Sequence, residues 1–175
     1  MLLKELLYGV KTISLSGKTD KEITALQIDS RAVQPGNCFI AIKGSATDGH
    51  LFIETAISNG ASAIICETLP ENIVEQITYV QVMDASIAAG LMAHIFYGEP
   101  STKFNLVGVT GTNGKTTVAT LLHRLFTGLG YHCGLISTIQ NEIGSEVFKA
   151  THTTPDAIQL NALLHNMQEA GCEYV

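Results

Sequence analysis

The chain has 175 residues, of which 46% are hydrophobic and 15% are charged. This balance is typical of one ordinary globular domain, or of a small domain with part of a second, and it argues against a disordered chain. The net charge of -6 and the isoelectric point near 5.4 argue against nucleic acid as a partner.

The apolar runs of the sequence are short. Lys4 and Glu5 interrupt the N-terminal run, so it lacks the apolar centre of a signal peptide. No run reaches the roughly 18 residues that are needed to span a bilayer. We therefore expect a cytoplasmic protein without membrane insertion. The four cysteines lie far apart and include no CxxC pair, which predicts buried, reduced thiols rather than a zinc site.

The first hundred residues alternate segments that are typical of strands and helices. In chain order they are a helix at 3–9, strands at 23–31 and 38–44, a helix at 51–60, strands at 61–67 and 77–82, and a helix at 85–98. This alternation predicts a small α/β domain. The residues at 98–103 include glycine, proline and serine without apolar periodicity, so we expect domains at 1–99 and 100–175.

The second domain is expected to begin with a buried strand at 104–110. A helix at 115–130 with four leucines on one face, a strand at 131–137 and a helix at 153–171 follow it. The last four residues begin another strand, and a parallel sheet of so few strands is not easily covered on both faces. We interpret this half as the start of a Rossmann-like ATP-binding domain with a phosphate loop, in a chain that is a fragment of a longer protein.

The stretch Val109-Thr-Gly-Thr-Asn-Gly-Lys-Thr-Thr117 joins the expected strand to the expected helix. Its two glycines let the backbone turn without a Cβ clash, so that successive N–H groups can bind phosphate oxygens where the helix begins. The usual phosphate loop has glycine at position 109, and the pattern that fits here is T-G-T-N-G-K-T. A glycine-rich strand-to-helix turn without a ligand is the alternative, but a lysine in the first helical turn opposes the helix dipole.

We therefore expect ATP and Mg²⁺ to bind at this loop. Lys115 is the expected catalytic residue, because its ammonium can reach the β- and γ-phosphates, and the hydroxyl of Thr116 is the expected metal ligand. The residues expected to contact ATP are Gly111, Thr112, Asn113, Gly114, Lys115, Thr116 and Thr117.

The stretch VGVTGTNGKTT resembles the ATP-binding loop of the Mur ligase family. Two further segments resemble the branch of that family that adds the third amino acid of the peptidoglycan stem peptide. IDSR at 28–31, followed by PGNCFIAIKGSATDGH at 35–50, is similar to its N-terminal uridine-nucleotide domain, and THTTPDA at 151–157 is similar to a segment that contacts the substrate. The three segments span the chain in the right order.

The resemblance implies an ATP-dependent amide ligase of cell-wall synthesis. Such enzymes add meso-diaminopimelate or L-lysine to UDP-N-acetylmuramoyl-L-alanyl-D-glutamate through an acyl phosphate. The implied partners are small molecules, namely that nucleotide, ATP and the diamino acid, and we expect a monomer. The family's acidic metal-binding segment and C-terminal domain do not occur in this sequence, so we expect the chain alone not to catalyse the ligation.

The resemblance also implies two groups of substrate contacts. The uridine nucleotide would be held by Ile28, Ser30, Ser45, Ala46 and Thr47, and the sugar-peptide by His152, Thr153 and Thr154. Structural explanations exist for both groups. Asp29 and Arg31 can satisfy local backbone groups in a turn, and Thr154 followed by Pro155 can begin a helix as its N-cap and first residue.

Two other functions stay open. One is the related ligase that adds a D-Ala-D-Ala dipeptide, although THTTPD at 151–156 and the spacing of the other motifs favour the first reading. The other is a truncated nucleotide-binding module without catalytic activity. Composition alone does not separate this module from a ligase.

Overall fold

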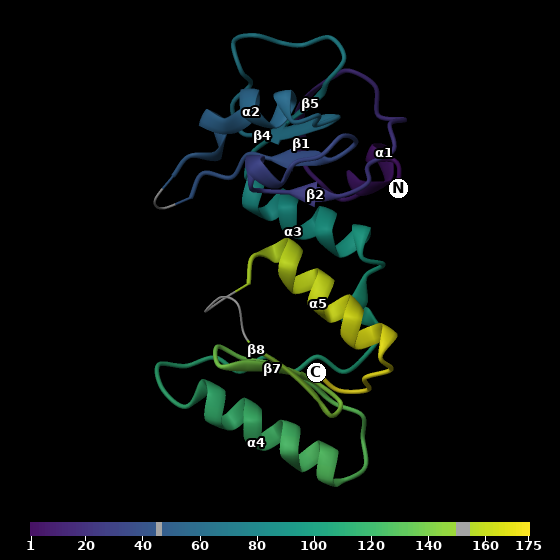
Figure 1. Ribbon diagram of the computed structural model, residues 1–175, viewed down its shortest axis with the longest axis vertical. Coiled ribbons are helices and arrows are strands. Elements are labelled where there is room, and N and C mark those ends of the chain that lie inside the picture. Colours follow the sequence, from purple (N-terminus) through teal and green to yellow (C-terminus); the bar gives the residue numbers. More distant parts are fainter. Residues whose placement is uncertain (45–46, 150–154) are drawn as a thin grey trace. The chain divides into compact units, whose positions relative to one another are not determined.

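The computed structural model describes residues 1–44, 47–149 and 155–175. The chain divides into two compact units, Met1–Phe96 and Tyr97–Val175, which Figure 1 shows as ribbons. The predicted domain boundary lies a few residues further along the chain than this division. Each unit combines helices with a sheet, so the predicted α/β class is confirmed.

A five-stranded sheet with the order β1-β5-β4-β3-β2 forms the centre of the first unit. The strands are β1 (Thr12–Ser16), β2 (Leu26–Gln27), β3 (Cys38–Ile40), β4 (Ala63–Cys66) and β5 (Thr78–Val82). Strands β2 to β5 run parallel, and β1 pairs antiparallel with β5. Parallel strands that are covered on both faces read as continuous apolar runs, which is why β3 and β4 were recognisable in the sequence.

Helices lie on the two faces of this sheet (Figure 1). The helical elements of the unit are α1 (Leu3–Leu6), η1 (Ser30–Ala32), η2 (Gly49–Phe52), α2 (Ile53–Ser58) and α3 (Ala85–Phe96). Phe39, Ile64 and Tyr79 share one buried cluster with residues of α2. Because side chains alternate across a strand, the neighbouring strand residues face the opposite side, towards α3.

Several expected elements of the first unit differ from the observed ones. The strand expected at 23–31 is only two residues long, and the chain then turns into the 3₁₀ helix η1. The helix expected at 51–60 begins at Ile53, because the side chain of Asp48 accepts a hydrogen bond from the His50 N–H and starts η2 before it. Strand β1 was not predicted. All five of its residues are exposed, so it lacks the alternation by which a half-buried strand is recognised.

The second unit contains a three-stranded sheet and two long helices. Its elements are η3 (Pro100–Thr102), α4 (Lys115–Gly128), β6 (Gly134–Ile136), β7 (Gln140–Ile143), β8 (Glu146–Lys149) and α5 (Ala157–Glu169). The sheet has the order β6-β7-β8 and is antiparallel. The hairpin of β7 and β8 was not predicted, and Gly144 forms its turn at a φ of 57°.

The strand expected at 104–110 is wrong. Asn105 forms a single parallel bridge with Tyr174, and the Val107 N–H donates to the carbonyl of Val175 at 2.8 Å. Leu106 and Val107 are about half exposed, at 49% and 53%. The apolar composition of this segment indicated a buried strand, but its observed backbone pairing is confined to the last residues of the chain.

Three of the four leucines expected on one face of the helix at 115–130 are exposed, and the fourth, Leu122, is half-buried. Leu121, Leu125 and Leu129 are all exposed, and α4 has no fully buried residue among those described.

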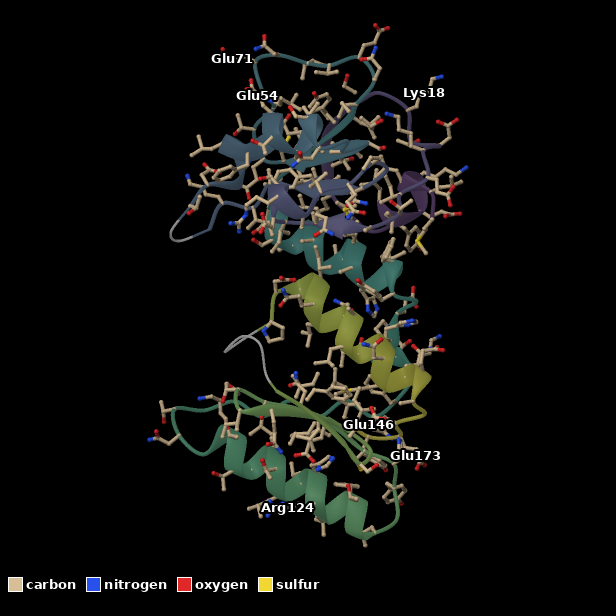
Figure 2. All side chains as sticks on the ribbon, in the orientation of Figure 1. Lys18, Glu54, Glu71, Arg124, Glu146 and Glu173 are labelled. Carbon is tan, nitrogen blue, oxygen red and sulfur yellow. The ribbon has the colours of Figure 1, made fainter. Side chains whose placement is uncertain are left out.

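Charged side chains of both units also lie at the surface. Figure 2 labels six exposed ones, which are Lys18, Glu54, Glu71, Arg124, Glu146 and Glu173.

The four cysteines are free and buried, as predicted, and they are Cys38, Cys66, Cys133 and Cys172. Burial raises the pKa of the Cys66 thiol to about 11 and raises the pKa of Cys38 as well. The thiolate is the reactive form of cysteine, so both thiols are protonated and unreactive at neutral pH. Among the described residues, no helix is both long enough and apolar enough to cross a membrane.

Candidate functional site

The phosphate loop leads directly into α4, which begins at Lys115. Gly114 is the N-cap of this helix at a φ of 82°, and Gly111 has a φ of 151°, so both occupy the region that favours glycine. Apart from its own chain neighbours, no atom of the described residues lies within 4 Å of the place where a Cβ on Gly114 would be. No side chain caps the first turn of α4 within the described part of the chain. Its first backbone N–H groups therefore remain available to an anion.

The side chain of Lys115 folds back over the loop. Its Nζ donates a hydrogen bond to the carbonyl oxygen of Gly111 at 2.7 Å. The ammonium therefore lies over the turn that the two glycines form, although the helix dipole disfavours a positive charge at this end. Thr116 is half-buried, whereas Thr112, Asn113 and Thr117 are exposed.

A cavity of about 560 Å³ adjoins the loop within the second unit. Lys115 and Thr116 line one part of it, Ser137 and Thr138 line another, and Pro155 lines a third. The space therefore brings together the start of α4, the segment after β6 and the segment before α5. A cavity of this size with a cationic group and hydroxyls beside an uncapped helix N-terminus has the chemistry to hold a phosphorylated ligand.

Ser137 and Thr138 were not among the predicted site residues. Both directly follow β6, and the sequence had indicated the strand that precedes them. The sequence held no signal that would have identified the two residues, because β6 pairs antiparallel with β7 and the rule for ligands at strand ends applies to parallel sheets. The hydroxyl of Ser137 already donates its proton within the protein, because its Oγ donates a hydrogen bond to the carbonyl of Gln140 at 2.6 Å.

Helix α5 begins differently from the prediction. Asp156 is the N-cap, and its carboxylate accepts from the N–H groups of Ile158 at 2.9 Å and Gln159 at 2.8 Å. The prediction that Thr154 caps the helix, with Pro155 as its first residue, is therefore wrong. An aspartate is the stronger cap here because it accepts two hydrogen bonds and its negative charge favours the helix N-terminus. These N–H groups are also no longer free to bind a substrate anion.

Replacing Asp156 with alanine should lower the free energy of unfolding by about 1 kcal/mol, because two N–H groups of α5 lose their acceptor. Urea unfolding followed by circular dichroism measures this loss. Asp156→Asn is the matched control, because asparagine caps helices nearly as well and should recover most of the loss. Equal stability of the wild-type protein and Asp156→Ala would show that the cap contributes nothing.

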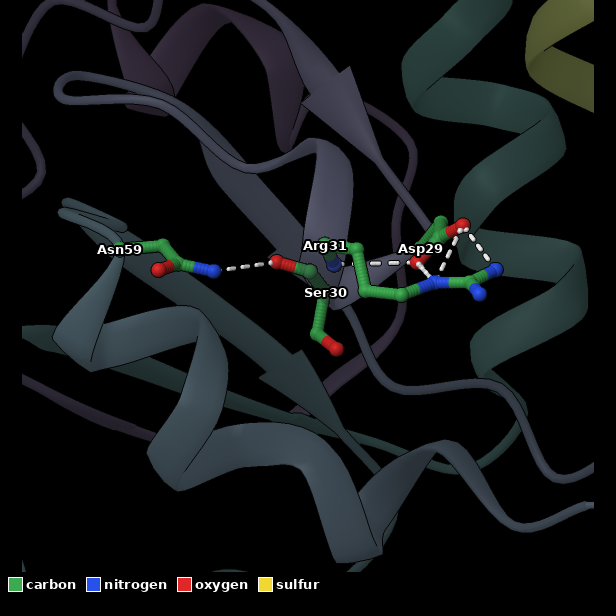
Figure 3. Close-up of polar contacts among 4 residues, drawn as sticks. All are labelled: Asp29, Ser30, Arg31 and Asn59. Carbon is green, nitrogen blue, oxygen red and sulfur yellow. Dashed lines mark hydrogen bonds and ion pairs between the residues drawn. The ribbon is translucent and has the colours of Figure 1, made fainter.

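The substrate residues predicted in the first unit follow strands β2 and β3. Ile28 is half-buried and Ser30 is 5% exposed, and the carbonyl of Ser30 accepts from Asn59 Nδ2 at 2.9 Å (Figure 3). Thr47 is exposed, and its carbonyl accepts from the Gly44 N–H at 3.0 Å. The other predicted substrate residues lie outside the described residues, and they are Ser45, Ala46, His152, Thr153 and Thr154.

Asp29 satisfies a local backbone group, as the structural explanation of this segment required, whereas the Arg31 guanidinium pairs with the Asp29 carboxylate rather than with the backbone. The Asp29 carboxylate accepts from the Arg31 N–H at 3.0 Å and from Arg31 Nη2 at 2.7 Å (Figure 3). These hydrogen bonds hold the pKa of Asp29 below its usual value. The pair shapes η1, but it neither supports nor opposes a ligand at Ser30.

A second cavity of the second unit, of about 330 Å³, is lined by none of the loop residues 111–117. It is lined mostly by apolar side chains, including Leu122, Phe126 and Leu135, and none of the predicted site residues lines it. His123 lies on its wall, with Nδ1 3.7 Å from Glu142 Oε2. The cavity beside the phosphate loop also has many apolar lining residues, but Lys115, Thr116, Ser137 and Thr138 line it as well, so it is the better candidate for the nucleotide.

Comparisons with known proteins find Mur ligases in both halves of the chain. The family described as "Mur ligase family, catalytic domain" matches residues 22–97, and "Mur ligase middle domain" matches residues 109–175. A UDP-N-acetylmuramoyl-L-alanyl-D-glutamate--2,6-diaminopimelate ligase from Cytophaga hutchinsonii is 53% identical over 99% of this chain. A ligase of the same name from Bacteroides fragilis is 51% identical over 100% of it.

Solved structures give the same result. A structure of a UDP-N-acetylmuramoyl-L-alanyl-D-glutamate--2,6-diaminopimelate ligase matches 99% of this chain and 34% of its own, with a TM-score of 0.74 and 26% identity. A MurF ligase from Thermotoga maritima in complex with ADP matches 88% of this chain and 31% of its own, with a TM-score of 0.56 and 26% identity. The chain spans 36% of the length of the curated relatives from C. hutchinsonii and B. fragilis. Since two Mur ligase domains match in chain order and the relatives align over the whole chain, the protein belongs to the Mur ligase family.

Proposed function

We propose that this chain supplies the uridine-nucleotide and ATP sites of a cytoplasmic ligase that adds 2,6-diaminopimelate to UDP-N-acetylmuramoyl-L-alanyl-D-glutamate. One observation carries the proposal. Relatives that bear this activity in their names are 45–53% identical to the chain over 99–100% of its length. The T. maritima MurF ligase, which is described as a complex with ADP, supports the nucleotide part.

The geometry of the phosphate loop supports ATP as the ligand. ATP, with Mg²⁺, supplies the phosphoryl group that turns a carboxylate, which is a poor acyl donor, into a good one. The uncapped N–H groups of α4 would bind phosphate oxygens. Lys115 would exchange its hydrogen bond with Gly111 for the charge of the nucleotide, and the hydroxyl of Thr116 would hold the metal ion.

The first unit would hold the uridine nucleotide. Ile28 and Ser30 follow β2, and Ser45, Ala46 and Thr47 follow β3, so both segments leave the carboxyl ends of parallel strands. Ligands of parallel α/β sheets bind beyond these ends. The sugar-peptide would lie near His152, Thr153 and Thr154, which directly precede the Pro155 that lines the cavity of Lys115.

The test is an assay of phosphate release by the complete polypeptide that carries these 175 residues. We expect release that requires MgATP, UDP-N-acetylmuramoyl-L-alanyl-D-glutamate and meso-diaminopimelate together. L-lysine in place of diaminopimelate tests the choice of amine, and D-Ala-D-Ala with the corresponding tripeptide nucleotide tests the alternative ligase. Activity with the dipeptide D-Ala-D-Ala alone, or no release with any combination, would refute the proposal.

The isolated chain offers a second test. We expect MgATP to raise its melting temperature, because a ligand that binds only the folded state stabilises it. We expect no ligation by these 175 residues alone. ADP release that depends on the peptide substrate would contradict this expectation.

A further inference from the structure

His50 lies at the centre of a set of hydrogen bonds beside the loop that follows β3. Its side chain is only 16% exposed. Nδ1 lies 2.7 Å from Asp48 Oδ1, and Nε2 accepts from the N–H of Glu67 at 2.9 Å and from the N–H of Thr68 at 3.3 Å. Because Nε2 accepts from two N–H groups, it carries no proton. The single proton of the neutral ring is therefore on Nδ1 and is donated to Asp48.

These contacts fix the base of the loop that contains Thr47. Lys43 and Asp48 form an antiparallel bridge across it, and the Gly44 N–H donates to the carbonyl of Thr47 at 3.0 Å. The Gly49 N–H donates to the carbonyl of Ile42 at 2.9 Å, and a Cβ on Gly49 would lie only 2.7 Å from that oxygen. The two sides of the loop are thus held together. The imidazole of His50 connects them to the backbone that follows β4, through its hydrogen bonds with the N–H groups of Glu67 and Thr68.

The hydrogen bonds continue across the sheet from Glu67. Its carbonyl accepts from Gln81 Nε2 in β5 at 3.0 Å, and its Oε1 accepts from the N–H of Ala85, the first residue of α3, at 3.0 Å. Gln81 in turn accepts from Ser14 Oγ in β1 at 3.0 Å. The loop after β3 is therefore connected through one imidazole to two further strands and a helix. A side-chain network of this kind restrains the groups it connects more than separate pairs do.

We propose that His50 is a positioning residue for the uridine-nucleotide subsite. The neutral ring holds the segment of Thr47 and Asp48 at the carboxyl edge of the sheet, in the geometry that receives the ligand. This inference rests on the function proposed above. An imidazole suits the task because it donates from one side and accepts on the other with a rigid ring between them, so that the Asp48–Glu67 spacing is fixed.

A purely structural brace is the competing explanation, and the two make different predictions. A residue that only stabilises the fold contributes to the free energy of unfolding. Its loss changes KM for the uridine substrate and KM for ATP together, or changes neither. A positioning residue affects the affinity for the uridine ligand and leaves the ATP site unchanged, because the phosphate loop belongs to the other unit.

The experiment compares His50→Ala, His50→Gln and His50→Asn in the complete polypeptide. Uridine 5′-diphosphate binding is measured by calorimetry, and KM is measured separately for the uridine substrate and for ATP. In His50→Ala we expect Kd and KM for the uridine ligands to rise about tenfold, on the order of the net loss of one or two hydrogen bonds, with KM for ATP unchanged. His50→Gln should recover part of the affinity, because its amide can still accept from Glu67.

His94→Gln is the matched control, since His94 lies nine residues beyond Ala85 on α3 and takes part in none of the hydrogen bonds described for this network. Unchanged affinity for uridine 5′-diphosphate in His50→Ala would overturn the proposal. If His50→Ala does not fold, the affinities of His50→Gln and His50→Asn for uridine 5′-diphosphate are compared instead. Asparagine can reach Asp48 but not Glu67, so equal affinities of these two variants would overturn the proposal. A wild-type protein that binds MgATP but no uridine ligand would refute the proposed uridine site, and with it the role of His50.

Discussion

Replacing Lys115 with alanine is expected to reduce ligase turnover by about 10²–10³-fold, the usual effect of removing one group that stabilises charge in the transition state. The ammonium is available for this role because its only described partner is the carbonyl of Gly111, at 2.7 Å and at the surface. A nucleotide can therefore replace that partner at little cost. The measurement is phosphate release under saturating uridine substrate and diaminopimelate, in the complete polypeptide.

The same substitution should remove most of the thermal stabilisation by MgATP, while the melting temperature without nucleotide changes little. Lys103→Ala is the matched control, because Lys103 is another exposed lysine of the second unit and lies outside the phosphate loop. Equal stabilisation of the wild-type protein and Lys115→Ala by MgATP would mean that the loop is only a structural turn.

Replacing Phe39 with alanine is expected to be the most damaging single change to the first unit, at a cost of about 3–5 kcal/mol. Phe39 is 0% exposed in β3, where it pairs with Gln27 of β2 and Ile64 of β4. Truncation removes buried apolar area and leaves a cavity that neighbours in a close-packed sheet cannot fill. Since whole domains are stable by only about 5–15 kcal/mol, the variant should be largely unfolded at moderate urea concentration.

Urea unfolding followed by circular dichroism tests this expectation. Phe52→Ala is the matched control, because it makes the same chemical change at a side chain that is 39% exposed. More than a third of Phe52 remains in water and its truncation leaves no enclosed cavity, so the loss should be smaller, about 1–2 kcal/mol. A loss in Phe39→Ala no larger than that of the control would show that the α2 face of the sheet is not the core of the unit.

The sequence was informative where a local pattern has one physical solution. Strands β3 and β4 were recognised because strands covered on both faces must be apolar throughout. The turn before α4 was recognised because glycine at positions 111 and 114 permits a backbone conformation that other residues avoid, and both have a positive φ. The spacing of glycine, lysine and threonine predicts a nucleotide at this turn, and that part stays a prediction.

The sequence was less informative where residues distant along the chain determine the local structure. The segment 104–110 is apolar enough for a strand, but a strand needs a partner, and its observed pairing is limited to the last residues of the chain. Asp156 and Thr154 are both good caps by residue type, and only the three-dimensional path of the backbone assigned the cap to Asp156.

By itself, the sequence determined the α/β class and the family, because these depend on periodicity and on residue types at fixed spacing. Only the tertiary structure placed Ser137 and Thr138 beside Lys115 and Thr116, since these pairs are distant in the chain and meet around one cavity. Only the tertiary structure showed His50 bonded to the backbone of Glu67. A hydrogen bond between residues seventeen positions apart depends on how two parallel strands align, and no local pattern encodes that alignment.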